Sequence, residues 1–255
     1  MNVMGLDMSS KKTGFSYFEE DKLIDYGYWM CSASDWRKRI VYMADQIKKY
    51  VEEHHVDMIY AEDVPPMSEN MQTVKVLAAL QGMLLSISVT HNIPIKFVPV
   101  KTWKQVLGMN LSSSRANVKM KKRVKDDFGV KAVRRLKSWV KHEEKKLSID
   151  YANDTHGIDL KFKALMSKKN EDDIADSINV AWSQIPGAKP YKLEKFEDIM
   201  EEFYLKLKEK DESNPVPIPY KAAFCCASTL IANSKSSPNL LSIIYSCYFL
   251  PFSNL

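Results

Sequence analysis

The sequence has 255 residues, 45% of them hydrophobic and 27% charged, which is enough to bury one sizeable core. Its formal net charge of +5 favours polyanionic partners over acidic proteins, although many proteins with so small an excess never touch nucleic acid. No basic segment followed by an apolar run marks the N-terminus, and no uninterrupted apolar run reaches the roughly 20 residues that span a bilayer. We therefore expect a soluble, intracellular protein that is located in the cytoplasm.

The first hundred residues alternate between strand-like and helix-like patterns. The predicted elements, in chain order, are strands over 2–7, 14–18 and 23–30, a helix over 35–53, a strand over 56–61, a helix over 71–89 and a strand over 95–98. Pro65-Pro66 predicts an irregular segment before the second helix. Strands first, then strands alternating with helices, predict an α/β fold in which helices flank a mixed five-stranded sheet.

The rest of the chain has a weaker pattern. Basic residues recur from Lys101 to Lys125 with no Asp or Glu between them, which fits either a nucleic-acid surface or a solvated helix face. Residues 130–169 are polar and lysine-rich, and no element is assigned to them. Helices are predicted over about 171–184 and 193–210. The last segment, 213–255, contains no Asp or Glu and is treated as a tail of unknown role.

Four carboxylates stand at the ends or on the face of predicted elements. Asp7 ends the first strand and Glu62 follows the fourth. If these two strands run parallel side by side, both acids lie at the same edge of the sheet. Asp173 and Asp176 are three residues apart, so a helix places both on one face. If that helix packs beside the strand ends, the four carboxylates converge.

Such a cluster repels itself unless cations neutralise it. Oxygen ligands without Cys or His select Mg²⁺ or Mn²⁺ over softer metals. Two such ions, roughly 4 Å apart, can activate a water and stabilise the departing oxygen in phosphodiester hydrolysis. Each acid alone has a plainer explanation: a strand end is often solvated, and Asp172 and Asp173 suit a helix N-terminus. The joint pattern points to a metal-dependent nuclease.

These motifs resemble the RuvC family of Holliday junction resolvases over about residues 1–184. The matching segments are Gly5-Leu6-Asp7-Met8-Ser9-Ser10-Lys11-Lys12-Thr13-Gly14, Met58-Ile59-Tyr60-Ala61-Glu62, Leu77-Ala78-Ala79-Leu80-Gln81-Gly82, Val100 to Gly108, and Asp173-Ile174-Ala175-Asp176-Ser177. In the family, the glycine that corresponds to Gly82 lets elements approach closely. An aromatic residue often follows the second acid, whereas Asp63-Val64-Pro65-Pro66 stands here, so stacking from that position is not expected.

The resemblance implies an RNase H-like fold, a homodimer, and paired nicking of a four-way DNA junction with Mg²⁺, Mn²⁺ being a substitute, and two ions at each site. The implied catalytic and metal-binding residues are Asp7, Glu62, Asp173 and Asp176. The expected DNA-binding residues are Lys101, Lys104, Arg115, Lys119, Lys122 and Arg123. The expected organisation is a nuclease domain over 1–186 with an insertion at 130–169, a C-terminal helix over 187–212, and the tail.

Three other functions fit part of the pattern. An RNase H acting on RNA–DNA hybrids shares the metal chemistry, and a junction-binding scaffold needs no cutting; substrate tests separate both from a resolvase. A phosphotransferase of the actin and sugar-kinase class also begins with an Asp followed by small hydroxyl residues and Gly, but the chain is short for two lobes. Trp103 and Trp139 fit either stacking on bases or, more commonly, packing in the core.

Overall fold

The computed structural model describes residues 1–64, 71–164, 167, 169–191 and 196–213. The predicted irregular segment at Pro65-Pro66 and the predicted tail beyond Ser213 lie outside these residues. The chain divides into two compact units, Met1–Tyr204 and Leu205–Leu255. The first unit contains the sheet and all the residues expected at the site.

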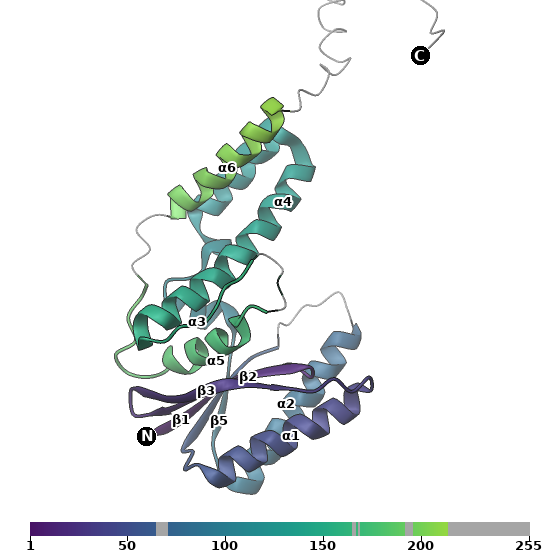
Figure 1. The fold of residues 1–255 in the computed structure, drawn as a ribbon, viewed down its shortest axis with the longest axis vertical. Helices are drawn as coiled ribbons and strands as arrows, with labels where there is room; N and C mark the ends of the chain where they lie inside the picture. The colour runs from purple at the N-terminus through teal and green to yellow at the C-terminus, as the bar shows by residue number, and fades with distance from the viewer. Residues whose placement is uncertain (65–70, 165–166, 168, 192–195, 214–255) are drawn as a thin grey trace, which may run out of the picture. The chain divides into compact units, whose positions relative to one another are not determined.

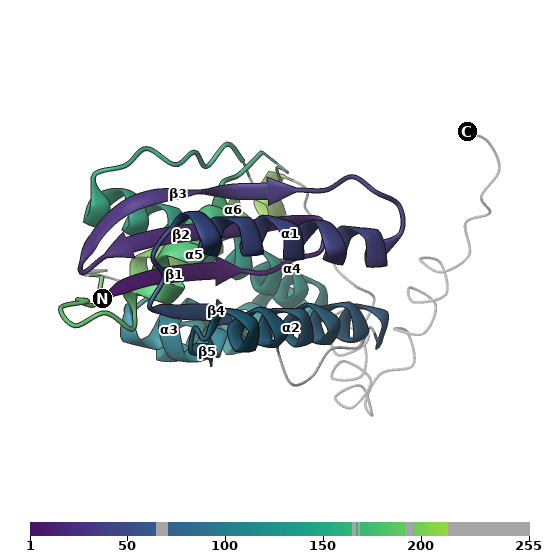
Figure 2. The same ribbon diagram turned by 90° about the horizontal axis from the view of Figure 1, so that it is seen from below.

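Five strands form one mixed sheet in the order β3-β2-β1-β4-β5, visible in Figure 2. The strands are β1 (Asn2–Asp7), β2 (Lys12–Glu19), β3 (Lys22–Met30), β4 (Met58–Glu62) and β5 (Ile95–Val98). β2 runs antiparallel to both β1 and β3, whereas β1, β4 and β5 are parallel neighbours. The predicted α/β fold, in which helices flank a mixed five-stranded sheet, is confirmed. The first and fourth strands are parallel neighbours, which is the condition under which Asp7 and Glu62 share one edge of the sheet.

Helices lie on both sides of this sheet (Figure 1). The helical elements are α1 (Trp36–Glu53), α2 (Met71–His91), α3 (Val100–Val106), the short 3-10 helix η1 (Leu111–Ser113), α4 (Arg115–His156), α5 (Asp172–Trp182) and α6 (Phe196–Ser213). α1 and α2 pack together on one face, and α5 packs on the other against β1, β2 and β4. The elements predicted from the sequence are all present, with bounds that differ by three residues at most.

Alternation along the strands decides which side of the sheet each side chain enters. The core under α1 and α2 receives Met4 and Leu6 from β1 and Ile59 and Ala61 from β4. Gly5, between Met4 and Leu6, faces α5, because a Cβ there would lie 2.2 Å from the carbonyl oxygen of Ser177. Asp7 and Glu62 have the parity of Gly5 and therefore emerge on the α5 side.

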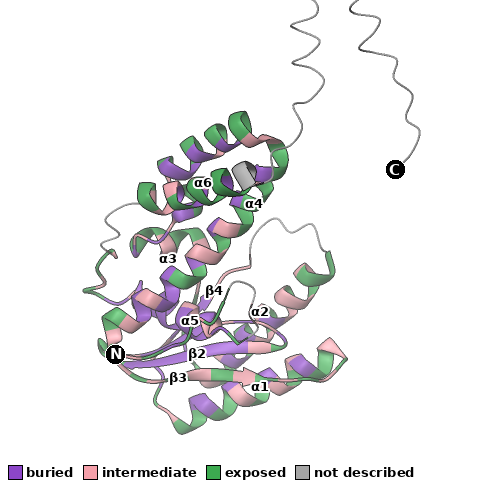
Figure 3. Cartoon of the chain, turned by 45° about the horizontal axis from the view of Figure 1, so that its top comes forward, coloured by how far each residue is buried: buried purple, intermediate pink, exposed green. Residues whose placement is uncertain are grey.

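α5 approaches the sheet closely because two glycines leave room for it. A Cβ at Gly14 would lie 2.0 Å from the carbonyl oxygen of Asp173. Gly14 is paired with Asp7 across β1 and β2, so the start of α5 rests directly on the strand pair that carries the first acid. Ser16 Oγ donates to the carbonyl oxygen of Ser177 at 3.0 Å and fixes the register of the helix. Figure 3 shows β2 largely buried beneath this helix.

α4 is 42 residues long and bends at Gly129, where φ is 78° and ψ is −177°. That backbone conformation is essentially restricted to glycine. Ser114 caps the helix by accepting from the Asn117 backbone amide, and Gly157 ends it in the left-handed conformation. Residues 130–156, for which the sequence predicted no element, form the second half of α4. The buried positions of this segment have helical spacing: Ala132, Leu136, Val140 and Leu147. The many lysines between them made this spacing hard to recognise in the sequence.

Two features of α2 bear on expectations from the sequence. By length and composition it is apolar enough to cross a membrane, although no uninterrupted apolar run of that length was found in the sequence. It packs on α1 and buries Leu80, Leu84 and Ile87, and a single helix of this kind is weak evidence for a membrane span. Close approach at Gly82 was also expected, but no heavy atom of the described residues comes within 4 Å of a Cβ built there. That glycine lies on an exposed side of the helix.

Candidate active site

Four acids come together at the carboxyl-end edge of the parallel strands. Asp7 ends β1 and Glu62 ends β4, and the two strands are adjacent and parallel. Asp173 and Asp176 lie in the first turns of α5, which rests on the same strands. Burial raises the pKa of Asp7 well above its usual value, and the charges of Glu62, Asp176 and Asp173 raise it further. The structure thus brings together all four acids that the sequence singled out.

The proximity of these acids also affects the pKa values of two more members of the cluster, Glu62 and Asp176. Burial and then the charge of Asp176 raise the pKa of Glu62 to about 7, against the opposing effects of Lys104 and of a hydrogen bond from Trp103. Burial likewise raises the pKa of Asp176, while Lys104 and a hydrogen bond from Ser148 lower it. Full ionisation of the cluster is therefore unfavourable unless cations are bound.

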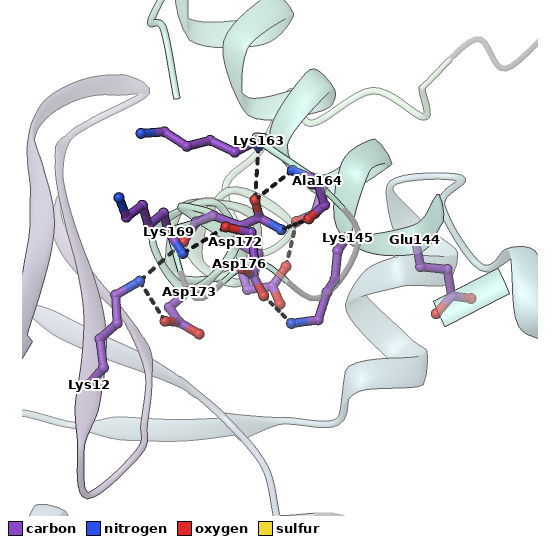
Figure 4. Close-up of polar contacts among 12 residues, drawn as sticks. Lys12, Glu144, Lys145, Lys163, Ala164, Lys169, Asp172, Asp173 and Asp176 are labelled. Carbon is purple, nitrogen blue, oxygen red and sulfur yellow. Dashed lines mark hydrogen bonds and ion pairs between the residues drawn. The ribbon is translucent and has the colours of Figure 1, made fainter. Parts of the chain in front are cut away.

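Three lysines lie beside the acids, and two of them, Lys12 and Lys145, are labelled in Figure 4. Lys12 of β2 pairs with Asp173 at 2.9 Å and also donates to the carbonyl oxygen of Asn170 at 3.3 Å. Lys145 of α4 pairs with Asp172, which is largely buried at the start of α5. The remaining lysine, Lys104 of α3, pairs with the buried Glu144 of α4 at 3.3 Å. These ion pairs balance part of the negative charge at the site.

Two further side chains hold the acids in place. Trp103 is fully buried, and its Nε1 donates to Glu62 Oε2 at 3.2 Å. Ser148 Oγ donates to Asp176 Oδ1, and is itself held by Asn179, whose Nδ2 donates to that hydroxyl at 2.8 Å. Trp103 therefore packs in the core, the commoner of its two expected roles, while also touching the site.

Sequence reasoning missed several residues that contact the cluster. Lys12 stood inside the first motif without being assigned a role, and Asp172 was considered only as a helix-terminal acid. Ser148 and Lys145 gave no signal, because they lie about 30 residues before their partners on a helix that the sequence did not reveal. Only the packing of α4 against α5 brings them to the site.

The six residues expected to bind DNA occupy three kinds of environment. Lys101, Arg115, Lys119 and Lys122 are exposed on α3 and on the first half of α4. Lys104 is only 14% exposed and belongs to the acid site. Arg123 is exposed but engaged, because it pairs with Glu201 at 2.7 Å and lies 3.5 Å from the centre of the Tyr204 ring. Trp139 packs against the ring of Phe203 at 5.1 Å, which leaves it poorly placed for stacking on a base.

The acid cluster suits a hard divalent cation. Its donors are carboxylate oxygens, the ligands that Mg²⁺ prefers, and their mutual repulsion is the state that a cation would relieve. Among the residues that the structure describes, no three Asp, Glu, His or Cys side chains are already arranged as a ligand set. Asp172 and Asp173 instead face lysines. The chemistry of the residues present therefore fits such a cation.

Comparison with known protein families finds a match in the N-terminal part of the chain. Residues 3–126 match the family described as crossover junction endodeoxyribonuclease RuvC. The matched segment contains Asp7 and Glu62 and ends before α5. This confirms the resemblance that the motifs indicated and supports a junction-resolving nuclease. No curated protein matches the chain.

Solved structures of three resolvases are similar to the chain. RuvC of Thermus thermophilus in complex with a Holliday junction substrate is 11% identical, with a TM-score of 0.49, over 75% of this chain and 100% of that one. The fowlpox virus Holliday junction resolvase is 17% identical, with a TM-score of 0.36, over 72% and 98%. The yeast mitochondrial Holliday junction resolvase Ydc2 is 16% identical, with a TM-score of 0.39, over 79% and 83%.

Proposed function

We propose that this RuvC-like chain is a metal-dependent endonuclease that cuts branched DNA and resolves four-way junctions by paired nicks. The observation that carries the proposal is the convergence of Asp7, Glu62, Asp173 and Asp176 at one edge of the sheet, in a chain whose residues 3–126 match the RuvC family. A carboxylate cluster of this kind serves phosphodiester hydrolysis. The protein would act inside the cell, where its DNA substrate lies.

The same four acids would hold the cofactor, which we propose to be two Mg²⁺ ions, or Mn²⁺ in their place. When bound, the ions would supply the positive charge that stabilises phosphodiester hydrolysis. Asp173, which pairs with Lys12 in the structure, would be one of the residues that hold the ions. Trp103 and Ser148 restrict Glu62 and Asp176 respectively, which reduces the reorganisation that binding requires.

We propose a role for Lys104 that differs from that of the exposed lysines on α3 and α4. Burial alone would lower its pKa, but Asp176, Glu144 and Glu62 more than compensate, and the pKa is raised. It therefore stays protonated beside the acids at neutral pH. A permanent cation at this point can face the scissile phosphate and offset charge that develops there during the reaction.

DNA would be held mainly through its phosphates. The exposed residues Lys101, Arg115, Lys119 and Lys122 are proposed to make these contacts, with the shape of the branch selecting the substrate. Arg123 is proposed to join them after leaving Glu201. Two symmetric cuts on a two-fold substrate call for two related sites, so we propose that the active form is a homodimer. Sedimentation of the protein with and without a junction tests the dimer.

Cleavage of synthetic substrates tests the activity. The substrates are a four-way junction, a linear duplex, a flap and an RNA–DNA hybrid, each with Mg²⁺ or with EDTA. Wild type is compared with Asp173→Asn and, as a control, Asp45→Asn, which alters an exposed acid on α1, the helix on the other face of the sheet. We expect paired, Mg²⁺-dependent nicks on the junction that disappear in Asp173→Asn and persist in the control.

Other outcomes distinguish the alternatives. Cutting confined to the hybrid would identify an RNase H, and tight junction binding without cutting in either Mg²⁺ or Mn²⁺ would identify a scaffold. A protein that neither binds nor cuts any of the four substrates would refute the nucleic-acid function.

A further inference from the structure

We infer that the second half of α4 carries an additional phosphate-binding surface, the α4 basic face, which holds one DNA arm as it leaves the catalytic edge. This surface consists of Lys131, Arg134, Arg135, Lys141 and Lys145. It lies beyond the segment that matches the RuvC family and apart from the DNA-binding residues expected from the sequence. The inference rests on the proposed function, since it assigns a further contact to the same DNA substrate.

The charge of this part of the helix is uniformly positive. Between Asp127 and Glu143 the chain contains no Asp or Glu, while five cations occur: Lys131, Arg134, Arg135, Lys137 and Lys141. The preceding stretch of α4 does include acids, and its Asp127 accepts a hydrogen bond from Tyr204. A positively charged stretch of this length is the electrostatic signature of a polyanion-binding surface.

Helical spacing collects most of these cations on one side. Lys131, Arg134, Arg135 and Lys141 recur at intervals of one, three or six residues around a single face, and all four are exposed. The opposite side of the same turns is apolar and buried, with Ala132, Leu136 and Val140. The cations therefore have one direction in common, away from the protein.

Four of the five cations of the α4 basic face have no acid opposite them in the part of the chain that the structure describes, and the fifth, Lys145, pairs with Asp172. Among the described residues, Lys131, Arg134, Arg135 and Lys141 make no ion pair. By contrast, Arg123 pairs with Glu201, and Lys146 pairs with Asp150 at 3.4 Å. Unneutralised cations repel one another and hold counterions, so phosphate groups that replace those counterions gain binding free energy from their release.

The α4 basic face leads directly to the acids. Its last member, Lys145, pairs with Asp172 and lines an open cavity of about 410 Å³. The other lining residues are Lys12, Met30, His142, Ser167, Asn170, Asp172 and Asp173. Figure 4 shows Lys145 and Lys12 approaching Asp172 and Asp173 from different elements. A strand that lies along the helix would thus enter the catalytic edge between the two lysines.

The length of the α4 basic face indicates how much DNA it can contact. From Lys131 to Lys145 a helix advances about 21 Å, at about 1.5 Å per residue. One strand of duplex DNA rises about 3.4 Å per nucleotide, so the face spans about six base pairs. The side chains on it are basic or polar and include no large apolar anchor of the kind that dominates protein interfaces. Duplex DNA is therefore a better fit than an acidic protein.

Binding without cutting provides the test. The full-length chain is titrated in EDTA with junctions whose arms are long or are shortened below about six base pairs, and with linear duplex. The variant is Arg134→Gln/Arg135→Gln/Lys141→Gln. The matched control is Lys38→Gln/Lys48→Gln/Lys49→Gln, which removes the same charge from exposed positions on α1, the helix that covers the other face of the sheet. Thermal unfolding confirms that both variants are folded.

We expect the α4 variant to bind long-armed junctions at least about tenfold more weakly near 0.1 M salt. The slope of log K against log salt should also decrease by about 2.7, since each phosphate contact contributes about 0.9. Short arms should remove the difference in affinity between the variant and wild type. The control should change the slope by less than about 0.9, the contribution of one phosphate contact.

Two results would overturn the inference: an α4 variant that binds long-armed junctions like wild type, or a loss in the α1 control as large as that in the α4 variant. Failure of the proposed function gives a different result. If wild type binds linear duplex but not the junction, the resolvase proposal is lost, and the duplex titration still decides for or against the α4 basic face. If wild type binds no DNA at all, both are lost.

Discussion

Ser148 shows how a residue without chemistry of its own can set an acid in place. It donates to Asp176 and accepts from Asn179, so the carboxylate has one favoured orientation. We expect Ser148→Ala to raise the Mg²⁺ concentration needed for half-maximal cutting by about 10- to 100-fold, because outer partners orient metal ligands. Junction affinity in EDTA should not change. A loss of affinity equal to the loss of cutting would show that Ser148 acts on folding or on DNA binding instead.

His156 provides a prediction about stability and pH. Burial lowers its pKa to about 4, and its ring packs edge-on against Phe18 and Trp182. Because the folded protein holds this histidine neutral, unfolding takes up a proton when the pH falls below the ordinary value near 6.5. The stability that this group contributes is therefore complete above about pH 6.5 and declines as the pH falls toward 4.

The substitution His156→Phe keeps an aromatic ring and removes the titration. The difference in free energy of unfolding between wild type and this variant should be constant above about pH 7 and should shift against wild type between pH 6.5 and 4. Denaturant titrations of both proteins across this range measure it. The acid cluster is common to both proteins and cancels in the difference, so a constant difference down to pH 4 would mean that His156 is not held neutral.

The contact between α5 and the sheet depends on glycine at one position and not at another. A Cβ at Gly14 would meet the backbone of Asp173 at 2.0 Å, and backbone cannot easily move aside. We expect Gly14→Ala to destabilise the fold by about 3 kcal/mol, the upper end for overpacking, and to abolish cutting by displacing Asp173. Denaturant unfolding and the junction assay measure the two effects.

Gly82 is the matched control, since it lies in the interior of α2 with no atom of the described residues near its Cβ position. Gly82→Ala should stabilise the protein by about 0.5 to 1 kcal/mol through helix propensity, with cutting retained. Loss of cutting with intact stability would instead show that this side of α2 is approached by DNA or by a second copy of the chain.

Metal binding should be visible in the stability of the whole molecule. The cluster raises the pKa of Asp7 by burial and by the charges of Glu62, Asp176 and Asp173, which means that its ionised form is disfavoured without a cation. At about 100 times its Kd, Mg²⁺ should stabilise the fold by about 2.7 kcal/mol. For a domain of this size the corresponding rise in Tm is roughly 5 to 10 °C.

Asp7→Asn separates this effect from general salt stabilisation. Without metal the variant should melt above wild type, because an amide is cheaper to bury than a crowded carboxylate. Its response to Mg²⁺ should be much reduced. Thermal unfolding in EDTA and in Mg²⁺, with Na⁺ at matched ionic strength as a control, provides the comparison. A variant that is less stable in EDTA and gains as much from Mg²⁺ as wild type would place the cation elsewhere.

The amino-acid sequence by itself determined the elements and the four acids. Strand alternation, helical spacing and the Asp-x-x-Asp pattern are local properties, so they identified β1, β4 and α5 together with Asp7, Glu62, Asp173 and Asp176. The order of strands and helices was also sufficient to predict the mixed sheet, whereas the parallel pairing of β1 and β4 was only a condition that the structure fulfils. The same local information could not reveal the second half of α4, because its apolar residues are few and are separated by many lysines.

Only the tertiary structure decided which side chains meet the acids. Lys12, Lys145, Trp103 and Ser148 reach the site from β2, α4 and α3, and each pairing depends on how those elements pack. The two close approaches of glycine to α5, and the absence of one at Gly82, likewise depend on distances across the fold. Contacts between distant segments are set by the shapes of packed surfaces, whereas the periodicity of a sequence specifies only which face of each element is buried.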